Sequence, residues 1–155
     1  PISLVAKHFP ELSVALTELA DRAASAPSTL CENDLLPMNV LWDGHDATII
    51  DFGHADISPY FGDPARFVAF GKPEGGYYVQ PTDAREKFLT QYFEIIRSMA
   101  GTTLDRARFD RDIALGEIAE LSLVFAAYIR RTTKFADVAS QPEFERILQL
   151  AHTLG

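Results

Sequence analysis

The sequence predicts an α+β fold in which helices predominate. Apolar residues recur at helical spacing over most of the chain, which indicates amphipathic helices. Residues 39–51 differ, because two short β-prone runs flank an Asp-Gly turn there. The 155 residues, 47% of them hydrophobic and 23% charged, are enough for one domain with its own core. We therefore expect residues 1–155 to form a single domain of helices packed around one small β-hairpin.

The first elements along the chain are a helix and the hairpin. A helix is expected over residues 10–25, because Pro10 suits a first turn and apolar residues follow at helical spacing until Pro27 interrupts the pattern. Residues 39–42 and 47–51 are expected to be the two strands of a buried hairpin.

A short helix and a loop follow the hairpin. Asp63 is the predicted N-cap of this helix and Pro64 its first residue, and the helix runs to Phe70. The Gly- and Pro-rich residues 71–76 are then expected to form a loop.

Three longer helical patterns fill the second half of the chain. The first begins at a capping box of Asp83 and Glu86 and ends at Gly101, and the third begins at Pro142. Their apolar stripes are expected to face the core. The stripes are Phe88, Tyr92, Ile95 and Met99 in the first helix, Ala114, Ile118, Leu121, Phe125 and Tyr128 in the second, and Phe144, Leu148 and Ala151 in the third.

The net charge of −8 argues against a broad basic face for nucleic acid. Residues 1–70 contain 10 acidic and 3 basic residues, whereas residues 71–155 contain 12 and 11. A solvated acidic surface is the simplest explanation of this imbalance, although a cationic substrate also fits it.

Composition also bears on where the protein works. No segment approaches the roughly 18 consecutive apolar residues of a membrane helix, and the first residues lack the pattern of a secretion signal. Cys31 is the only cysteine, so an intramolecular disulfide and a cysteine-based zinc site are excluded. We expect a soluble, cytoplasmic protein without a membrane partner. The start at Pro1, without methionine, suggests a piece of a longer chain or a trimmed one.

The segment from Leu30 to Asp56 carries acids and amides where a purely structural hairpin would have apolar residues. A loop with Asp34 leads into the first strand at Asn39, and the second strand ends at Asp51. A tight hairpin brings the start of one strand next to the end of the other, so these three side chains can converge. Phosphoryl transfer needs such a set: a carboxylate beside the attacking hydroxyl, and oxygen ligands for Mg²⁺ on the nucleotide phosphates.

The same segment resembles the kinase-like small-molecule phosphotransferases, whose pattern is His-x-Asp-x-x-x-x-Asn followed by Asp-Phe-Gly. The stretch CENDLLPMNVL is similar to choline and ethanolamine kinases, whereas IIDFGHA and GDPA are similar to aminoglycoside phosphotransferases. Glu32 stands where the family has His, and Leu36 stands where protein kinases have Lys. The resemblance covers residues 30–70.

The resemblance implies a protein-kinase-like C-terminal lobe whose hairpin carries the catalytic and metal-binding residues. By this matching Asp34 is the catalytic base, and Asn39 and Asp51 are the Mg²⁺ ligands. Leu41 and Ile50 would lie under the adenine of ATP. The implied activity is ATP- and Mg-dependent phosphoryl transfer to a hydroxyl of a small, cationic molecule, similar to choline, ethanolamine or an aminoglycoside.

The resemblance also implies an N-terminal lobe with a Gly-rich phosphate loop and a nucleotide-binding Lys. Only nine residues precede the first predicted helix, and Lys7 among them is expected to be a surface residue. We therefore expect the chain to need that lobe as a partner and to be inactive alone. Asp63 corresponds to a structural helix cap in the family, outside the site.

Two other functions stay open from the sequence. With Glu32 in place of His and without the N-terminal lobe, the chain could be a degenerate binding or regulatory module that has lost catalysis. His45-Asp46 and His54-x-Asp56 could instead belong to a metal-dependent phosphohydrolase, although His45-Asp46 falls in a predicted turn. The sequence determines neither the acceptor nor the oligomeric state.

Overall fold

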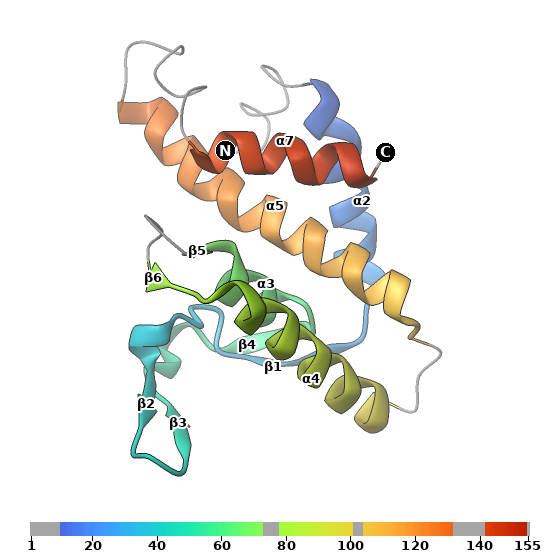
Figure 1. Ribbon diagram of the computed structural model, residues 1–155. Helices are drawn as coiled ribbons and strands as arrows, with labels where there is room; N and C mark the ends of the chain where they lie inside the picture. The colour runs from blue at the N-terminus through green and yellow to red at the C-terminus, as the bar shows by residue number, and fades with distance from the viewer. Residues whose placement is uncertain (1–9, 73–77, 101–103, 132–141, 155) are drawn as a thin grey trace.

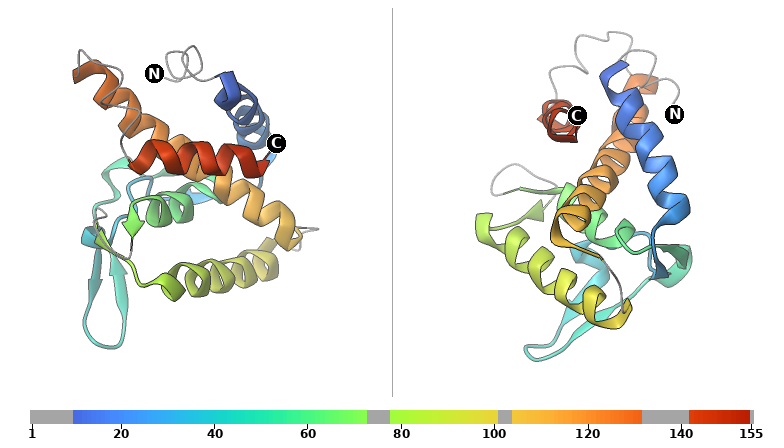
Figure 2. Two further views of the ribbon diagram at one scale, coloured as in Figure 1. Left: turned by 45° about the horizontal axis from the view of Figure 1, so that its top comes forward. Right: turned by 90° about the vertical axis from the view of Figure 1, so that its right-hand side faces the viewer.

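A computed structural model describes residues 10–72, 78–100, 104–131 and 142–154 of the chain. It confirms the α+β class with helices predominating. The longest helix, α5, crosses the molecule, with α2 and α7 on one side and α3 and α4 on the other (Figures 1 and 2). The helices are α2 (Pro10–Ser25), α3 (Gly62–Ala69), α4 (Thr82–Ala100), α5 (Arg106–Arg131) and α7 (Pro142–Leu154). None of these helices has an apolar stretch that could cross a membrane, within the residues searched.

The strands form three two-stranded sheets in the described part of the chain, where the sequence predicted one hairpin. That hairpin is present, with Val40 paired to Ile49, and it projects away from the helices (Figure 1). The other two sheets were missed. The pairs are β1 (Ser28–Cys31) with β4 (Asp56–Pro59), antiparallel; β2 (Val40–Trp42) with β3 (Ala47–Ile49), antiparallel; and β5 (Gly71–Lys72) with β6 (Tyr78–Val79), parallel.

The core has two clusters of buried side chains, and α5 contributes to both. The first cluster lies between α2, α5 and α7, where an aliphatic stripe of each helix meets the others. The second lies between α3, α4 and the first turns of α5 and is rich in aromatic rings. The first consists of Leu12, Ala15, Leu16, Ala69, Leu115, Ile118, Leu121, Phe144, Ile147 and Ala151. The second consists of Tyr60, Phe61, Val68, Leu89, Phe93, Leu104, Phe109 and Ile113.

Helices α3 and α5 approach each other closely at Gly116. A Cβ on this glycine would lie 2.5 Å from the Cβ of Ala65 and 3.2 Å from the ring of Phe61. Only a residue without a side chain lets the two helices pack at this separation. The contact fixes α3 against the longest helix, and α3 in turn faces the loop that contains Asp34.

The β2–β3 hairpin is exposed, and the prediction that it is buried was wrong. Every residue from Leu41 to Ile50 is solvent-accessible, and Trp42 retains 65% of its accessible surface. The period-2 pattern identified the strands but could not show whether a neighbouring element covers them.

Two helix caps also differ from the predictions. Helix α3 has Phe61 at its N-cap position without a side-chain hydrogen bond, and Asp63 lies inside the first turn. In α4 the predicted capping box is absent: the Asp83 carboxylate bonds to Lys87, and Glu86 bonds to Arg106. In both helices the carboxylates bond to other groups instead of capping their own helix end. Asp63 accepts two N–H groups of the loop, and Asp83 and Glu86 each bond to a positively charged side chain.

The predicted stripe of α4 is confirmed in part, because Phe88 and Tyr92 are partly buried against the second cluster. Leu89 and Phe93 are its buried side chains, whereas Ile95 and Met99 are 53% and 78% exposed. The stripes of α5 and α7 are confirmed at the positions whose side chains are described. The side chains of Phe125 and Tyr128, most of the predicted loop 71–76, and Lys7 lie outside the described residues.

Candidate functional site

The loop between β1 and the hairpin is held by the side chain of Asp63. The backbone N–H of Glu32 donates to Asp63 Oδ2 at 2.7 Å, and that of Asn33 donates to Oδ1 at 2.8 Å. Asn33 adopts a left-handed conformation with φ of 62°, and its amide donates to the carbonyl of His54 at 3.0 Å. These bonds give the loop a defined course directly before Asp34.

Asp34 and Asn39 are joined within this loop. The side-chain N–H of Asn39 donates to the backbone carbonyl of Asp34 at 3.0 Å, and the amide oxygen of Asn39 remains as an acceptor. Asn39 is 9% exposed, so its orientation is constrained by packing as well as by this bond. The short 3-10 turn Pro37–Asn39 leads from the loop into β2.

Asp51 is adjacent to Asn39 across the hairpin. The N–H of Ile50 donates to the carbonyl of Asn39 at 2.9 Å, which places Asp51 one residue beyond that pair. Asp51 has φ of 62° and ψ of 53°, a left-handed conformation that Asp tolerates better than most residues. Its carboxylate is exposed, and Oδ1 lies 3.4 Å from where a Cβ on Gly53 would stand.

Leu41 and Ile50 share one face of the hairpin. Leu41 pairs with Thr48 and Ile50 lies opposite Asn39, and side chains at such positions project to the same side. Both are open to solvent, at 55% and 36% of their accessible surface. They form an apolar surface beside Asn39, and their contact with adenine stays a prediction.

Glu32 is buried directly before Asp34. Its Oε2 accepts the backbone N–H of Asp34 at 2.9 Å, whereas its Oε1 has no hydrogen-bond partner. Burial raises the pKa of Glu32, and the negative charges of Asp34, Asp63 and Asp51 raise it further. Glu32 thus supports the backbone of the loop through a partner that the sequence did not indicate, the N–H of Asp34.

Arg66 of α3 connects Asp34 to helix α5. Its Nε donates to Asp34 Oδ1 at 2.9 Å, its Nη2 donates to the same oxygen, and its Nη1 donates to Glu120 Oε2 at 2.5 Å. Burial raises the pKa of Glu120, and the guanidinium lowers it in part. Burial acts to lower the pKa of Arg66, but Glu120 and Asp34 outweigh it, so the pKa of Arg66 is raised.

Asp34, Asn39 and Asp51 thus belong to the open end of one hairpin and the loop before it, which α3 holds through Asp63 and Arg66. Comparison with protein-family models matches residues 4–109 to the phosphotransferase enzyme family, APH. The chain belongs to this family. The matched residues include the loop, the hairpin, α3 and α4. No curated protein and no solved structure matches the chain.

Membership in the phosphotransferase enzyme family confirms the resemblance seen in residues 30–70 and assigns a kinase-like phosphotransferase type. Enzymes of the family typically use ATP and Mg²⁺. The membership gives no support to a His/Asp phosphohydrolase. His45 and Asp46 lie in the exposed hairpin turn, where both backbone N–H groups donate to Asp43 Oδ1 at 2.8 Å.

Sequence reasoning missed three residues around the phosphotransferase loop. Asp63 was assigned to a helix cap, although its place a dozen residues after Asp51 was a usable signal. Arg66 follows Asp63 by three positions and so lies on the same side of α3. Glu120 is 54 residues further along the chain from Arg66, and no local pattern could have connected the two.

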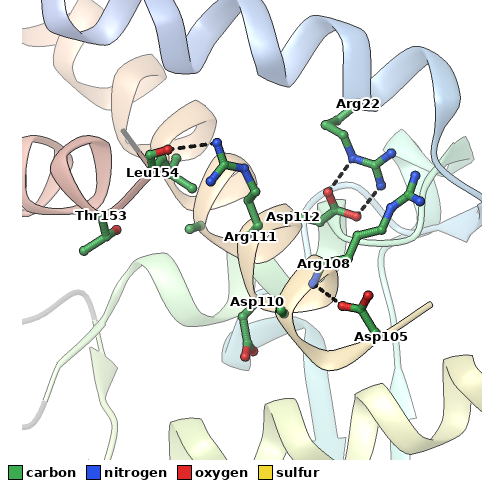
Figure 3. Close-up of a pocket in the computed structure, with 10 residues that line it drawn as sticks. Arg22, Asp105, Arg108, Asp110, Arg111, Asp112, Thr153 and Leu154 are labelled. Carbon is green, nitrogen blue, oxygen red and sulfur yellow. Dashed lines mark hydrogen bonds and ion pairs between the residues drawn. The ribbon is translucent and has the colours of Figure 1, made fainter.

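A depression of about 760 Å³ lies elsewhere, between α2, the start of α5 and the end of α7 (Figure 3). Two of its three arginines make structural contacts: Arg22 forms a two-pronged ion pair with Asp112 at 2.6 and 2.7 Å, and Arg111 donates to the carbonyl of Leu154 at 2.8 Å. Neither Asp34 nor any other predicted site residue lines it, so it is separate from the phosphotransferase loop.

Proposed function

We propose that this chain carries the catalytic residues of an ATP- and Mg-dependent phosphotransferase whose acceptor is a hydroxyl of a small, cationic molecule. The observation that carries the proposal is the hydrogen bond from Asn39 to Asp34, together with the position of Asp51 next to Ile50, whose N–H bonds to Asn39, in a member of the phosphotransferase enzyme family. Choline, ethanolamine or an aminoglycoside represents the acceptor class.

The oxygens of Asn39 and Asp51 suit Mg²⁺ that arrives with a nucleotide. The amide nitrogen of Asn39 is engaged with Asp34, which leaves its oxygen for a cation, and the exposed Asp51 follows Ile50, whose N–H bonds to the carbonyl of Asn39. Mg²⁺ often takes one or two protein oxygens and completes its octahedron with phosphate and water. Among the described residues no group of three or more His, Cys, Asp or Glu could hold a metal alone. Bound Mg²⁺ would neutralise charge on the phosphates.

Asp34 is the proposed general base. It takes the proton of the acceptor hydroxyl as the hydroxyl oxygen bonds to the γ-phosphorus, and the bond from that phosphorus to ADP breaks with its electron pair leaving on ADP. Asn39 holds the carbonyl of Asp34, and Glu32 holds its backbone N–H, so the base is restrained on both sides. Such restraint keeps the carboxylate within reach of the hydroxyl.

The charge around the base supports a cationic acceptor. Among the described residues near Asp34 there are more carboxyl groups than positively charged side chains. The first 70 residues also carry most of the net negative charge of the chain. A positive acceptor would be attracted to this region and stabilised beside it. The carboxyl groups are those of Asp34, Asp51, Asp63 and Glu120, and the cation is Arg66.

We propose further that the chain works as the C-terminal lobe of a kinase-like pair of lobes. The support is the exposed apolar surface of the hairpin, which no described element covers. Apolar exposure of this kind indicates a surface that another body covers. ATP would then lie between Leu41 and Ile50 on this lobe and the second lobe, and the chain alone would bind ATP weakly. The exposed apolar residues are Leu41 and Ile50 on this face of the hairpin, Trp42 and Ile49 on the opposite face, and Phe52 just after the second strand.

A degenerate binding module is the second candidate, and Glu32 is the observation that favours it. A buried carboxyl with an unpartnered oxygen, in a loop that elsewhere in the family carries His, is compatible with lost catalysis. Such a module would bind nucleotide or a partner without transferring phosphate.

Titration of the full-length protein with ATP, in the presence and absence of Mg²⁺, tests the proposed nucleotide site. We expect Mg-dependent binding that Asp51→Ala weakens by at least about tenfold, because it removes a metal ligand. Asp46→Ala, which removes an exposed acid from the turn of the same hairpin, is the matched control and should bind normally. Phosphoryl transfer to choline, ethanolamine and an aminoglycoside is then assayed. ATP binding without transfer to any acceptor favours the binding module, and absence of Mg-dependent binding overturns the proposal.

A further inference from the structure

We propose that Arg66 positions the base Asp34 for catalysis and that Glu120 supports Arg66 in this task. The inference rests on the proposed function, in which Asp34 accepts the proton of the acceptor. It adds Arg66 of α3 and Glu120 of α5 to the residues that act on the base. Neither residue belongs to the sequence pattern that identifies the loop.

The two oxygens of Asp34 have different surroundings. Oδ1 receives N–H donors from both Nε and Nη2 of Arg66, the first at 2.9 Å. Oδ2 receives no hydrogen bond from the part of the chain that the structure describes. The guanidinium therefore occupies one oxygen and leaves the other to take the proton of the hydroxyl. Hydrogen bonds between charged groups are directional and strong, so the carboxylate cannot rotate freely.

Arg66 is itself held from two further directions. Its Nη1 donates to Glu120 Oε2 at 2.5 Å, and its guanidinium lies 5.8 Å from the ring centroid of Phe70, one turn along α3. The guanidinium is planar and rigid, so the bond to Glu120 sets the direction of the two N–H groups that reach Asp34. The side chains of Arg66, Asp34 and Glu120 are 23%, 32% and 20% exposed, and this partial burial limits screening by water.

The arrangement also controls charge during the reaction. Two carboxylates share the one guanidinium, so a net negative charge remains beside the acceptor site. Arg66 thus orients the base without cancelling the attraction of the site for a cationic acceptor.

A second ion pair between helices provides a matched control. Arg85 of α4 donates to Glu117 of α5, as Arg66 of α3 donates to Glu120. The Arg85 side chain is 35% exposed, and Arg146 also bonds to Glu117 at 2.5 Å, so removal of Arg85 leaves that acid paired. Arg85 makes no described contact with Asp34. Its loss should affect stability but not the base.

The test measures steady-state kinetics of the full-length protein with ATP and the acceptors choline, ethanolamine and an aminoglycoside. We expect Arg66→Ala to lower kcat by about 10- to 100-fold with little change in the KM for ATP, because the base is misplaced while the nucleotide site is intact. Ethylguanidinium added to Arg66→Ala should restore part of kcat. Arg66→Lys and Glu120→Gln should show smaller losses, and Arg85→Ala should retain wild-type kcat.

Each result bears on one of the two proposals. Wild-type kcat in Arg66→Ala, or in Arg66→Lys if the alanine variant does not fold, overturns the role of Arg66. A loss that ethylguanidinium does not relieve and that Arg85→Ala reproduces assigns Arg66 a structural role and also overturns it. Asp34→Asn is assayed in parallel: if Asp34→Asn is impaired while the Arg66 variants are not, only this inference fails. Normal turnover by Asp34→Asn contradicts the proposed function itself.

Discussion

Glu32 is the residue at which this chain departs most from the pattern of its family. The side chain is 2% exposed, one of its oxygens holds the backbone of Asp34, and the other has no partner. A buried carboxylate without a counter-charge is costly, and a protonated carboxyl costs much less. Glu32 can therefore replace a neutral or hydrogen-bonding side chain as a support of the loop, provided that it keeps its proton.

This predicts a pH dependence of stability. Burial and nearby acids raise the pKa of Glu32 in the folded protein above its usual value of 4.5. Its contribution to the free energy of unfolding is then fully present below pH 4.5 and is lost as the pH rises through the folded-state pKa. Glu32→Gln cannot ionise, so its stability relative to wild type should increase as the pH rises through that window and level off above it.

Urea unfolding of both proteins at a series of pH values measures this difference. Glu94→Gln is the control, because Glu94 is exposed on α4 and pairs only with Arg97 of the same helix. Its difference from wild type should vary little with pH. A difference between Glu32→Gln and wild type that is constant across the pH series would show that Glu32 is not the titrating group.

At the level of single residues, the sequence placed Asp34, Asn39 and Asp51 around the same end of the hairpin, because they are close together in the sequence. Asp34, Asn39 and Asp51 lie within 18 positions, and a hairpin allows few arrangements of such a segment. The partners of Asp34 could not be predicted in the same way. Arg66 and Glu120 reach it from helices that are remote in sequence, and their contacts arise only once those helices pack.

Helix α3 and its contact with α5 are the elements that hold the loop. Asp63 and Arg66 are three residues apart on α3 and bond to the loop backbone and to Asp34, respectively. Gly116 and Glu120 are four residues apart on α5, so the closest approach of the helices and the support of Arg66 lie on one face. A change in the distance between α3 and α5 should therefore alter the position of Arg66 and of the loop that α3 holds.

Gly116→Ala tests this coupling. The added methyl group would stand 2.5 Å from the Cβ of Ala65, so the helices must separate, and we expect a loss of about 1–3 kcal/mol in the free energy of unfolding. Gly62→Ala is the matched control, because nothing lies within 4 Å of a Cβ there. Its effect should stay within about 0.5 kcal/mol.

Denaturant unfolding measures both variants, and hydrogen exchange at the amides of Glu32 and Asn33 reports on the loop. Faster exchange at these amides in Gly116→Ala than in Gly62→Ala is the expected result, since α3 carries the acceptor of both N–H groups. Equal exchange in the two variants would show that the loop does not depend on the packing of α3.

The elements themselves were predicted with uneven success for physical reasons. Long helices such as α2 and α7 carry enough turns for their periodicity to be read. Strands β1 and β4 have four residues each, too few for a clear alternation, and they are separated by 24 residues of loop and hairpin. The α4 stripe was predicted correctly at Phe88 and Tyr92 but missed the fully buried Leu89 and Phe93 beside them, because hydrophobicity alone does not distinguish adjacent apolar residues.

The whole molecule combines a helical body with a hairpin that contributes little to its core. Helix α5 joins the two core clusters, whereas the exposed apolar residues of β2 and β3 contact neither. Sequence pattern predicted those residues to be buried, and their exposure in this structure is the main support for a second lobe over the hairpin. The hairpin therefore connects the candidate site to the rest of the fold. One of its ends joins the loop that contains Asp34, and the other extends beyond the helices.

The most direct test of the account is single-turnover transfer of the γ-phosphoryl group of ATP by the full-length protein. Asp34→Asn should lower the transfer rate by about 10²-fold or more and leave the Kd for ATP nearly unchanged, because the base is lost and the nucleotide site is kept. Asp56→Asn, which alters an exposed acid of β4, should transfer at the wild-type rate. Transfer by Asp34→Asn at the wild-type rate would contradict the assignment of the site.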